Sequence, residues 1–356
     1  MSQPGAHPPS PIPGSAAIER LVDAKGILQH SRYATPDPAH GYCVDDNARA
    51  LILMHRSPDL AAAVHDRWAD LFGGFVDAAW NREAGAFRNF MDYDGAWLEA
   101  VGSEDSQGRA LWSLGVTAAE ARAPAQRAWA RALFDEAAAA VMALDSPRAM
   151  AFCILGAVEI LRLEPDNRHA TRFVTTFTDR LCRIAADEGR PGWPWFERSL
   201  AYDNARLPEA LLRAGVHCGR EDLVARGLAT LDWLAGKQTA AEGHFRPVGS
   251  TSFGRDYAEP RPYDQQPLEA QGMIEACAAA HAASGDLTWI ARAETAFAWF
   301  LGANDGGVAL ADFATGECYD GLTPDGPNLN GGAESVLAFQ LGARALSRLI
   351  AEERVS

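Results

Sequence analysis

A short polar motif recurs at intervals along the chain, and it constrains the fold more than any other feature. The segments Asp45–Leu51 and Asp105–Leu111 share the pattern D-x-x-x-R-A-L. The tetrad Asp46–Arg49 recurs letter for letter as Asp203–Arg206, and residues 145–150 carry a fainter copy. Each copy opens with polar residues and continues into apolar ones, which is typical of the start of a helix.

Two further segments, 263–269 and 330–335, open in the same way and bring the number of such openings to six. The openings are separated by roughly 40–70 residues, which is enough for one helix out, a turn and one helix back. Six helix pairs with equivalent openings on every second helix predict an all-α (α/α)6 toroid whose inner helices start at one rim. A bundle or a solenoid also contains helix pairs, but it does not need polar openings on alternate helices only.

Abundant alanine and scarce β-branched runs favour helix through most of the chain. The expected helices span residues 16–29, 45–56, 60–80, 105–120, 125–143, 147–163, 168–187, 203–216, 219–237, 266–284, 287–302 and 332–351. The proline-rich first residues predict a disordered tail over 1–15. We therefore expect a single toroid domain over 16–356.

The charge of the chain excludes some partners. The chain has 356 residues and a formal net charge of −15, so it repels phosphate backbones and anionic membrane surfaces, and we expect neither as a partner. No apolar run approaches the ~18–20 residues that cross a bilayer. The first residues also lack the basic and apolar regions of a secretory signal, so we expect a cytoplasmic protein.

Motifs for metals and cofactors are absent from the sequence. The six cysteines are spread without a C-x-x-C pair, which predicts reduced, mostly buried thiols. The nine histidines form no ligand pair at helical spacing, and no glycine-rich phosphate-binding motif occurs. We expect neither a metal site nor a cofactor.

Acidic residues concentrate at the six openings. The candidate catalytic residues are Asp46, Glu104, Asp105, Asp203, Asp264 and Glu334. A structural role is the alternative for each, because acids are common N-caps and favourable partners of the helix dipole. One cap does not require two adjacent acids, however, and both Asp45–Asp46 and Glu104–Asp105 supply two. Several acids in one cavity raise each other's pKa, which keeps a general acid protonated near neutral pH.

The residues around these acids are candidates for substrate binding. They are His40, Tyr42, Asp45, Arg49, Arg109, Trp193, Trp195, Tyr202, Asn204, Arg206, His244, Tyr263 and Gln265. Trp193 and Trp195 lie in a Pro/Gly loop, where exposed indoles would stack on sugar rings; a hydrophobic plug over the core is the alternative. Asp45 and Arg49 also fit a plain i,i+4 ion pair. The irregular stretch 243–266 predicts a pocket wall, with a mobile surface loop as the alternative.

On these motifs, the chain resembles the six-hairpin glycosidase-like proteins, which are (α/α)6 toroid enzymes that hydrolyse, phosphorolyse or epimerise sugars. The resemblance covers nearly the whole chain after the tail and is carried by Val44–Leu51, Glu104–Leu111 and Tyr202–Arg206. These motifs are also similar to a bacterial group found fused or adjacent to glycosyltransferases and mannoside-processing enzymes. The resemblance implies an oligosaccharide or glycoside substrate and a glycosyltransferase as a partner.

Three functions compete. The first is a glycoside hydrolase, which needs one protonated and one ionised carboxyl across the glycosidic bond. We expect the two from different openings, and inversion is favoured because the hydrolases that the chain resembles more often invert. The second is a sugar epimerase or isomerase on the same fold, with His40 and His244 as the histidines of the candidate loops. The third is a non-catalytic glycan-binding module that partners a glycosyltransferase.

Overall fold

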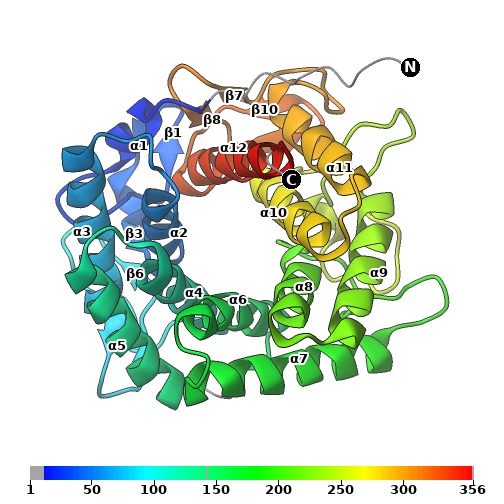
Figure 1. The fold of residues 1–356 in the computed structure, drawn as a ribbon. Helices are drawn as coiled ribbons and strands as arrows, with labels where there is room; N and C mark the ends of the chain where they lie inside the picture. The colour runs from blue at the N-terminus through cyan, green and yellow to red at the C-terminus, as the bar shows by residue number, and fades with distance from the viewer. Residues whose placement is uncertain (1–11, 142, 355–356) are drawn as a thin grey trace.

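Six inner helices form a closed ring in the computed structural model, which describes residues 12–141 and 143–354. These helices are α2 (Val44–His55), α4 (Glu104–Glu120), α6 (Pro147–Leu163), α8 (Arg206–Cys218), α10 (Pro267–Ser284) and α12 (Ala333–Glu353). Each contacts the next, and α12 contacts α2, so the ring closes (Figure 1). Closure excludes an open solenoid.

Six outer helices surround this ring. They are α1 (Ala16–Leu21), α3 (Ala62–Ala79), α5 (Pro124–Ala140), α7 (Arg168–Glu188), α9 (Glu221–Lys237) and α11 (Thr288–Ala298). Each outer helix from α3 to α11 packs against the inner helix that precedes it, and α1 packs against α12. The described helices therefore form six hairpins, the last of them joining the two ends of the chain, and the predicted (α/α)6 toroid is confirmed (Figure 1).

The segments that connect the helices differ strongly in length between the two ends of the toroid. The turns from an inner to an outer helix are short, as in 121–123 and 219–220. Most segments that lead into an inner helix are long, such as 80–103, 238–266 and 299–332. Long loops are therefore gathered at the rim where the inner helices begin, which is where binding residues are commonly placed.

Short antiparallel strand pairs stiffen several of these long segments. The pairs are β1 (Ser31–Arg32) with β2 (Thr35–Pro36), β3 (Tyr42–Cys43) with β6 (Phe90–Met91), β4 (Trp80–Asn81) with β5 (Ala86–Phe87), β7 (Ala311–Asp312) with β8 (Glu317–Cys318), and β9 (Gly321–Thr323) with β10 (Gly326–Asn328). The β3–β6 pair joins the segments that lead into α2 and α4. These loops therefore have fixed shapes.

Inner helices α4 and α6 pack unusually closely through glycines. A Cβ added to Gly115 would lie 2.2 Å from the carbonyl oxygen of Gly156, and one added to Gly108 would lie 2.6 Å from that of Ala149. Both contacts are with backbone, which cannot move aside as a flexible side chain can. The absence of side chains at these positions sets the distance between the two helices.

The observed helices follow the expected spans with two informative differences. The first helix ends at Leu21 and not at 29, because the chain turns at Asp23, whose Oδ1 accepts from the amide of Lys25. Helix α8 starts at Arg206 and not at 203. Of the predicted tail, residues 1–11 lie outside the described residues, while the amide of Gly14 donates to the carbonyl of Phe313. No helix in the described ranges is both long and apolar enough to cross a bilayer.

Candidate functional site

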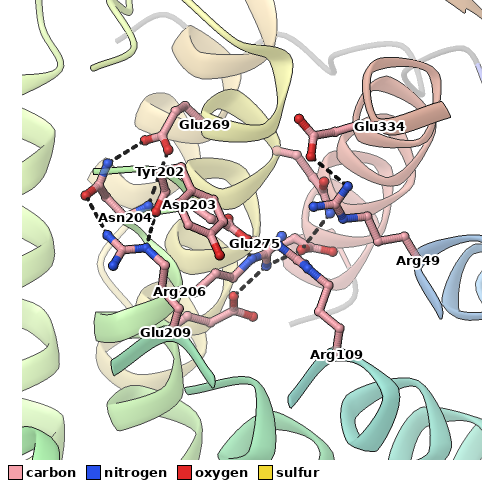
Figure 2. A network of polar contacts seen from close by, with 12 residues as sticks. Arg49, Arg109, Tyr202, Asp203, Asn204, Arg206, Glu209, Glu269, Glu275 and Glu334 are labelled. Atoms are coloured by element: carbon pink, nitrogen blue, oxygen red, sulfur yellow. Dashed lines mark hydrogen bonds and ion pairs between the residues drawn. The ribbon is translucent and has the colours of Figure 1, made fainter. Parts of the chain in front are cut away.

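Arg49 joins the openings of α2 and α12. Its guanidinium contacts Asp45 Oδ2 at 2.8 Å and Asp46 Oδ1 at 3.2 Å. It also contacts Glu334 Oε2 at 2.8 Å (Figure 2). The two aspartates stand in the first turn of α2, and Glu334 stands in the first turn of α12. One buried cation therefore gathers three carboxyl groups from two helices that are far apart in sequence.

A second arginine connects α2 and α4 to the segment before α8. Arg109 Nε lies 2.6 Å from Asp45 Oδ1, and its Nη2 lies 2.7 Å from Asp203 Oδ2. Asp203 also pairs with Arg206, whose guanidinium contacts Glu275 of α10 deeper in the ring (Figure 2). The arginine of each D-x-x-x-R motif thus binds an acid from another opening.

Polar contacts also link the openings of α4, α6, α8 and α10. Glu104 accepts from the amide of Ser146, the N-cap of α6, at 2.6 Å. Arg148 of α6 donates to the carbonyl of Tyr202. The Asn204 side chain donates to Glu269 of α10 at 3.0 Å (Figure 2). All six openings therefore face one end of the toroid, as the repeat predicts.

A cavity of about 610 Å³ opens among these helix starts. Its lining residues are Gln29, His30, Cys43, Asp45, Asp46, Asn89, Phe90, Ser103, Asp105, Tyr202, Gln266, Asp320, Asn328, Gly332, Glu334 and Ser335. A cavity of this size lies within the range of small-molecule sites, about 300–1,000 Å³. Most of its lining residues have polar side chains, and five of them carry carboxyl groups.

Asp46 is the most perturbed of these carboxyl groups. It is only 6% exposed, and the Cys43 thiol donates to its Oδ2 at 3.2 Å. Burial raises the pKa of Asp46 to about 7; Arg49 opposes the shift, and the neighbouring charges of Asp45 and Glu334 add to it. Asp46 can therefore hold a proton near neutral pH while it faces the cavity.

Asp105 is a second buried acid on the cavity wall. The Ser146 hydroxyl donates to its Oδ1 at 2.6 Å, and the Tyr202 hydroxyl donates to its Oδ2. Burial raises its pKa, although the hydrogen bond from Ser146 and the charge of Arg148 act against the shift. Both carboxyl oxygens of Asp105 are thus occupied by protein donors.

Three of the six candidate acids do not line the cavity. Asp203 is fully buried, and its pKa is lowered: burial raises it, but Arg206 and Arg109 outweigh burial. Glu104 accepts from the backbone before α6, and Asp264 is exposed outside the cavity lining. Asp203 and Glu104 are thus bound by other groups of the protein, and the catalytic roles of all three acids stay predictions from the sequence.

The tryptophans are not the exposed platforms that the sequence analysis favoured. Trp193 is 5% exposed and Trp195 is fully buried, and both rings pack against Trp233. Trp193 Nε1 donates to the carbonyl of Glu197 at 2.9 Å. The expectation of exposed indoles is wrong, because the loop between α7 and α8 turns both rings inward against Trp233 of α9.

The other candidate binding residues fall into three groups. Asp45 and Tyr202 line the cavity, and His40 borders it through His30, with ring centroids 4.6 Å apart. The residues that lie behind the wall in the polar network are Arg49, Arg109, Asn204 and Arg206. The residues that take no part in the cavity lining are Tyr42, His244, Tyr263 and Gln265.

Two of these last residues belong to another cluster. His244 Nε2 lies 3.0 Å from Asp305 Oδ1, and the Gln265 amide donates to Asp305 Oδ2 at 2.5 Å. Gln265 also accepts from the indole of Trp299. These contacts fix the segment 243–266 to the segment before α12. Within 243–266, Gln266 is the residue that lines the cavity.

Sequence reasoning missed several lining residues. Among them are Gln29, His30 and Asn89. All three lie in the segments that lead into α2 and α4, outside any repeated motif. The length of those segments was the only available signal, and it points to no particular residue.

Comparisons with known proteins place the chain by its fold. No protein-family model and no curated protein matches the sequence. A cellobiose 2-epimerase from Bacillus thermoamylovorans is 12% identical, with a TM-score of 0.70 over 96% of each chain. A sugar epimerase from a ruminal bacterium is 14% identical, with a TM-score of 0.69 over 94% of each chain. A GH76 α-mannanase from Bacteroides thetaiotaomicron is 11% identical, with a TM-score of 0.66 over 96% of this chain and 94% of that chain. At these identities the likeness shows the shared (α/α)6 toroid fold.

Proposed function

We propose that the protein is a carbohydrate-active enzyme that hydrolyses a glycosidic bond with the carboxyl groups of the cavity. The solved proteins of similar fold include enzymes that epimerise sugars or cleave mannans. The cavity has a suitable volume, and five carboxyl groups line it. The observation that carries the proposal is the pairing of a buried acid, Asp46, with a more exposed acid, Glu334, on the same arginine.

Asp46 is the proposed general acid. A general acid must be protonated before it meets the substrate, and the pKa of Asp46, about 7, satisfies this at neutral pH. Its burial away from water, together with the nearby charges of Asp45 and Glu334, disfavours loss of this proton. The rate should therefore fall as the pH rises through about 7, because Asp46 then loses the proton that it must donate.

Glu334 is the proposed second carboxyl group. Its side chain is 40% exposed, and Arg49 holds one of its oxygens. That oxygen and Asp46 Oδ1 bond the same nitrogen of Arg49, at 2.8 Å and 3.2 Å, so their separation cannot exceed the sum of those two distances. This limit is below the roughly 6.5–9.5 Å of inverting enzymes and suits the about 5–5.5 Å of retaining ones. The spacing of this pair therefore favours retention, where the sequence analysis favoured inversion.

The reaction follows from these roles. Glu334 attacks the anomeric carbon while Asp46 gives its proton to the glycosidic oxygen, so the bond to the leaving sugar breaks and a glycosyl ester forms. Asp46, now ionised, takes a proton from water, and that water attacks the ester. The products are two free sugars, and both carboxyl groups return to their initial state.

The test is turnover of a mixed oligosaccharide pool, measured as the release of reducing ends. Asp46→Asn and Glu334→Gln should each lower kcat by about 10²–10⁴-fold, because each removes a proton-transfer or nucleophilic group and keeps the shape. Asp94→Asn is the matched control, since Asp94 is exposed outside the cavity lining and is not a candidate catalytic residue, and it should keep wild-type activity. Near wild-type rates in both cavity variants would refute the assignment.

A specific contact supports epimerisation as the second candidate. His30 lines the cavity, and its ring meets that of His40 edge to face. Epimerisation next to a carbonyl needs a base that removes a carbon-bound proton, and histidine suits this at neutral pH. Incorporation of deuterium from heavy water into a reducing sugar, lost in His30→Gln and kept in Asp46→Asn, would favour this candidate over hydrolysis.

Two finer statements belong with this proposal. We propose a glycosyltransferase as a partner, which rests on the resemblance of the sequence motifs. We also propose a cytoplasmic location, which is supported by the six free cysteines. A non-catalytic glycan-binding role is the outcome to accept if sugars bind and neither hydrolysis nor deuterium exchange occurs.

A further inference from the structure

Asn89 occupies a fixed position beside the acidic start of α2. It lies between β5 and β6, and its carbonyl accepts from the amide of Val44, the first residue of α2, at 2.9 Å. Its own amide donates to Glu99 Oε1 at 2.7 Å. The backbone of Asn89 is thus held on both sides, and its side chain is free to serve another purpose.

The side chain of Asn89 is buried on the cavity wall with an unused acceptor. The residue is 8% exposed, and its Oδ1 has no hydrogen-bond donor within reach among the described residues. The neighbouring amide of Gln107 is different, because it accepts from the amide of Phe87 and donates to the carbonyl of the same residue. Buried polar groups are nearly always paired, so an unpaired one on a cavity wall points to a ligand that donates to it.

The charges around Asn89 define which ligand that is. The carboxyl groups on the wall belong to Asp45, Asp46, Asp105, Asp320 and Glu334, and no lysine or arginine is part of the described lining. Arg49 and Arg109 lie behind the wall and are already paired with carboxylates. The wall therefore offers acceptors to hydroxyl or amino groups, and it repels a ligand that carries a carboxylate or a phosphate.

We propose that Asn89 binds a hydroxyl or amino group of the substrate, and that the cavity accepts neutral and amino sugars and rejects uronates and sugar phosphates. This inference rests on the proposed function and adds the substrate class to it. It also disfavours phosphorolysis, because the attacking phosphate would have to enter a cavity walled by carboxylates. Asn89 acts in recognition and takes no part in the proton transfers.

The first experiment measures binding without turnover. Protein-observed NMR titrations would use methyl glucoside, glucosamine and glucuronate together with the corresponding mannose derivatives. The glucose and mannose derivatives are compared separately. In whichever of the two sets binds more tightly, the neutral sugar or the amino sugar should have an affinity at least about tenfold higher than the uronate. A uronate that binds as tightly as its neutral counterpart would overturn the inference, as would a complete lack of binding. If this order holds while the oligosaccharide pool is not hydrolysed, the proposed reaction fails and the substrate class stands.

The second experiment isolates Asn89. Asn89→Ala should lower the affinity for the probe that binds most tightly by about tenfold, which is the scale of one hydrogen bond. Its Tm should be unchanged. Asn304→Ala is the matched control: Asn304 is equally buried, at 8% exposed, but its amide donates to the carbonyls of Trp299 and Val308. That variant should lower Tm and keep the affinity. Wild-type affinity in Asn89→Ala would refute the role of Asn89.

A conservative variant covers the case in which Asn89→Ala does not fold. Asn89→Asp keeps the shape and an acceptor oxygen at the same place, and it adds one negative charge to the wall. It should keep or strengthen the binding of glucosamine and should further weaken glucuronate. An equal loss of affinity for both sugars would contradict the proposed contact.

Discussion

At the scale of single residues, the site depends on an acid that the fold holds at a cost in stability. Asp46 is buried beside Asp45 and Glu334, and Arg49 is the arginine that contacts all three carboxyl groups. Burial of an ionised carboxylate is unfavourable, which is why its pKa rises. The property that suits Asp46 to donate a proton is therefore also one that weakens the folded state above neutral pH.

The raised pKa of Asp46 should make the free energy of unfolding depend on pH. The pKa of Asp46 is about 7 in the folded state, against about 3.9 for an unperturbed aspartate, so between these values the folded state holds a proton that the unfolded chain has lost. The free energy of unfolding should therefore decrease as the pH rises through this window. Urea unfolding at pH 5 and pH 8 should show that Asp46→Asn is more stable than wild type at pH 8, with a smaller difference at pH 5. Burial also raises the pKa of Glu269 to about 7. Part of the decrease in the free energy of unfolding with pH should therefore remain in Asp46→Asn. A less stable variant at pH 8 would show that Asp46 is a structural ion-pair partner.

The sequence predicted the acids of the site better than its other residues. Asp46 and Asp105 could be found because paired acids at a helix start exceed what a cap requires. Asn89 and His30 could not, because their importance comes from loop shapes that bring them to the cavity. Asp203 carries the same motif as Asp46 and yet is buried between two arginines, so the motif alone does not separate an acid that lines the cavity from one that does not.

At the scale of elements, the inner ring depends on the close contact of α4 and α6. Gly115→Ala would place a methyl group against the carbonyl oxygen of Gly156, which neither helix can relieve without moving. We expect a loss of about 1–3 kcal/mol in the free energy of unfolding, the usual cost of overpacking. Gly74→Ala is the control, because an added Cβ there meets nothing within 4 Å and the residue lies inside α3. Equal stabilities of the two variants would contradict the proposed role of the contact.

The aromatic loop before α8 gives a second prediction for an element. Trp195 is fully buried against Phe196 and Trp233, so Trp195→Ala should lower the free energy of unfolding by about 3–5 kcal/mol. Since Trp195 does not line the cavity, sugar affinity should be unchanged where the variant is folded. A normal thermal melt combined with weakened sugar binding would restore the stacking role that the sequence analysis favoured.

Helices were more predictable than the segments between them. Helices have a period, caps and alanine-rich faces that can be read locally, so the spans of α4, α6 and α9 differ little from expectation. The direction of the tryptophan loop could not be read in this way. Trp193 and Trp195 turn inward because Trp233 on α9 offers them an apolar surface, and that contact is visible only in three dimensions.

At the scale of the whole molecule, the ring is closed by contacts between the two ends of the chain. Helix α12 packs against α1 and α2, and the Gln340 amide donates to the carbonyl of Gly14 at 2.6 Å. We propose that residues 16–356 are one domain, because each inner helix needs both neighbours to bury its sides. Circular dichroism and tryptophan fluorescence should then report the same unfolding midpoint. Two separate midpoints would show independent parts and contradict the single domain.

The central claim is that the carboxyl groups gathered at one rim by the repeated motifs process a sugar. The most direct measurement is a crystal structure after soaking with a mixed oligosaccharide pool. The account predicts a sugar ring in the cavity, with Asp46 at the glycosidic oxygen, Glu334 at the anomeric carbon and Asn89 in contact with a hydroxyl or amino group. A sugar bound elsewhere on the protein, with the cavity free of it, would contradict the account.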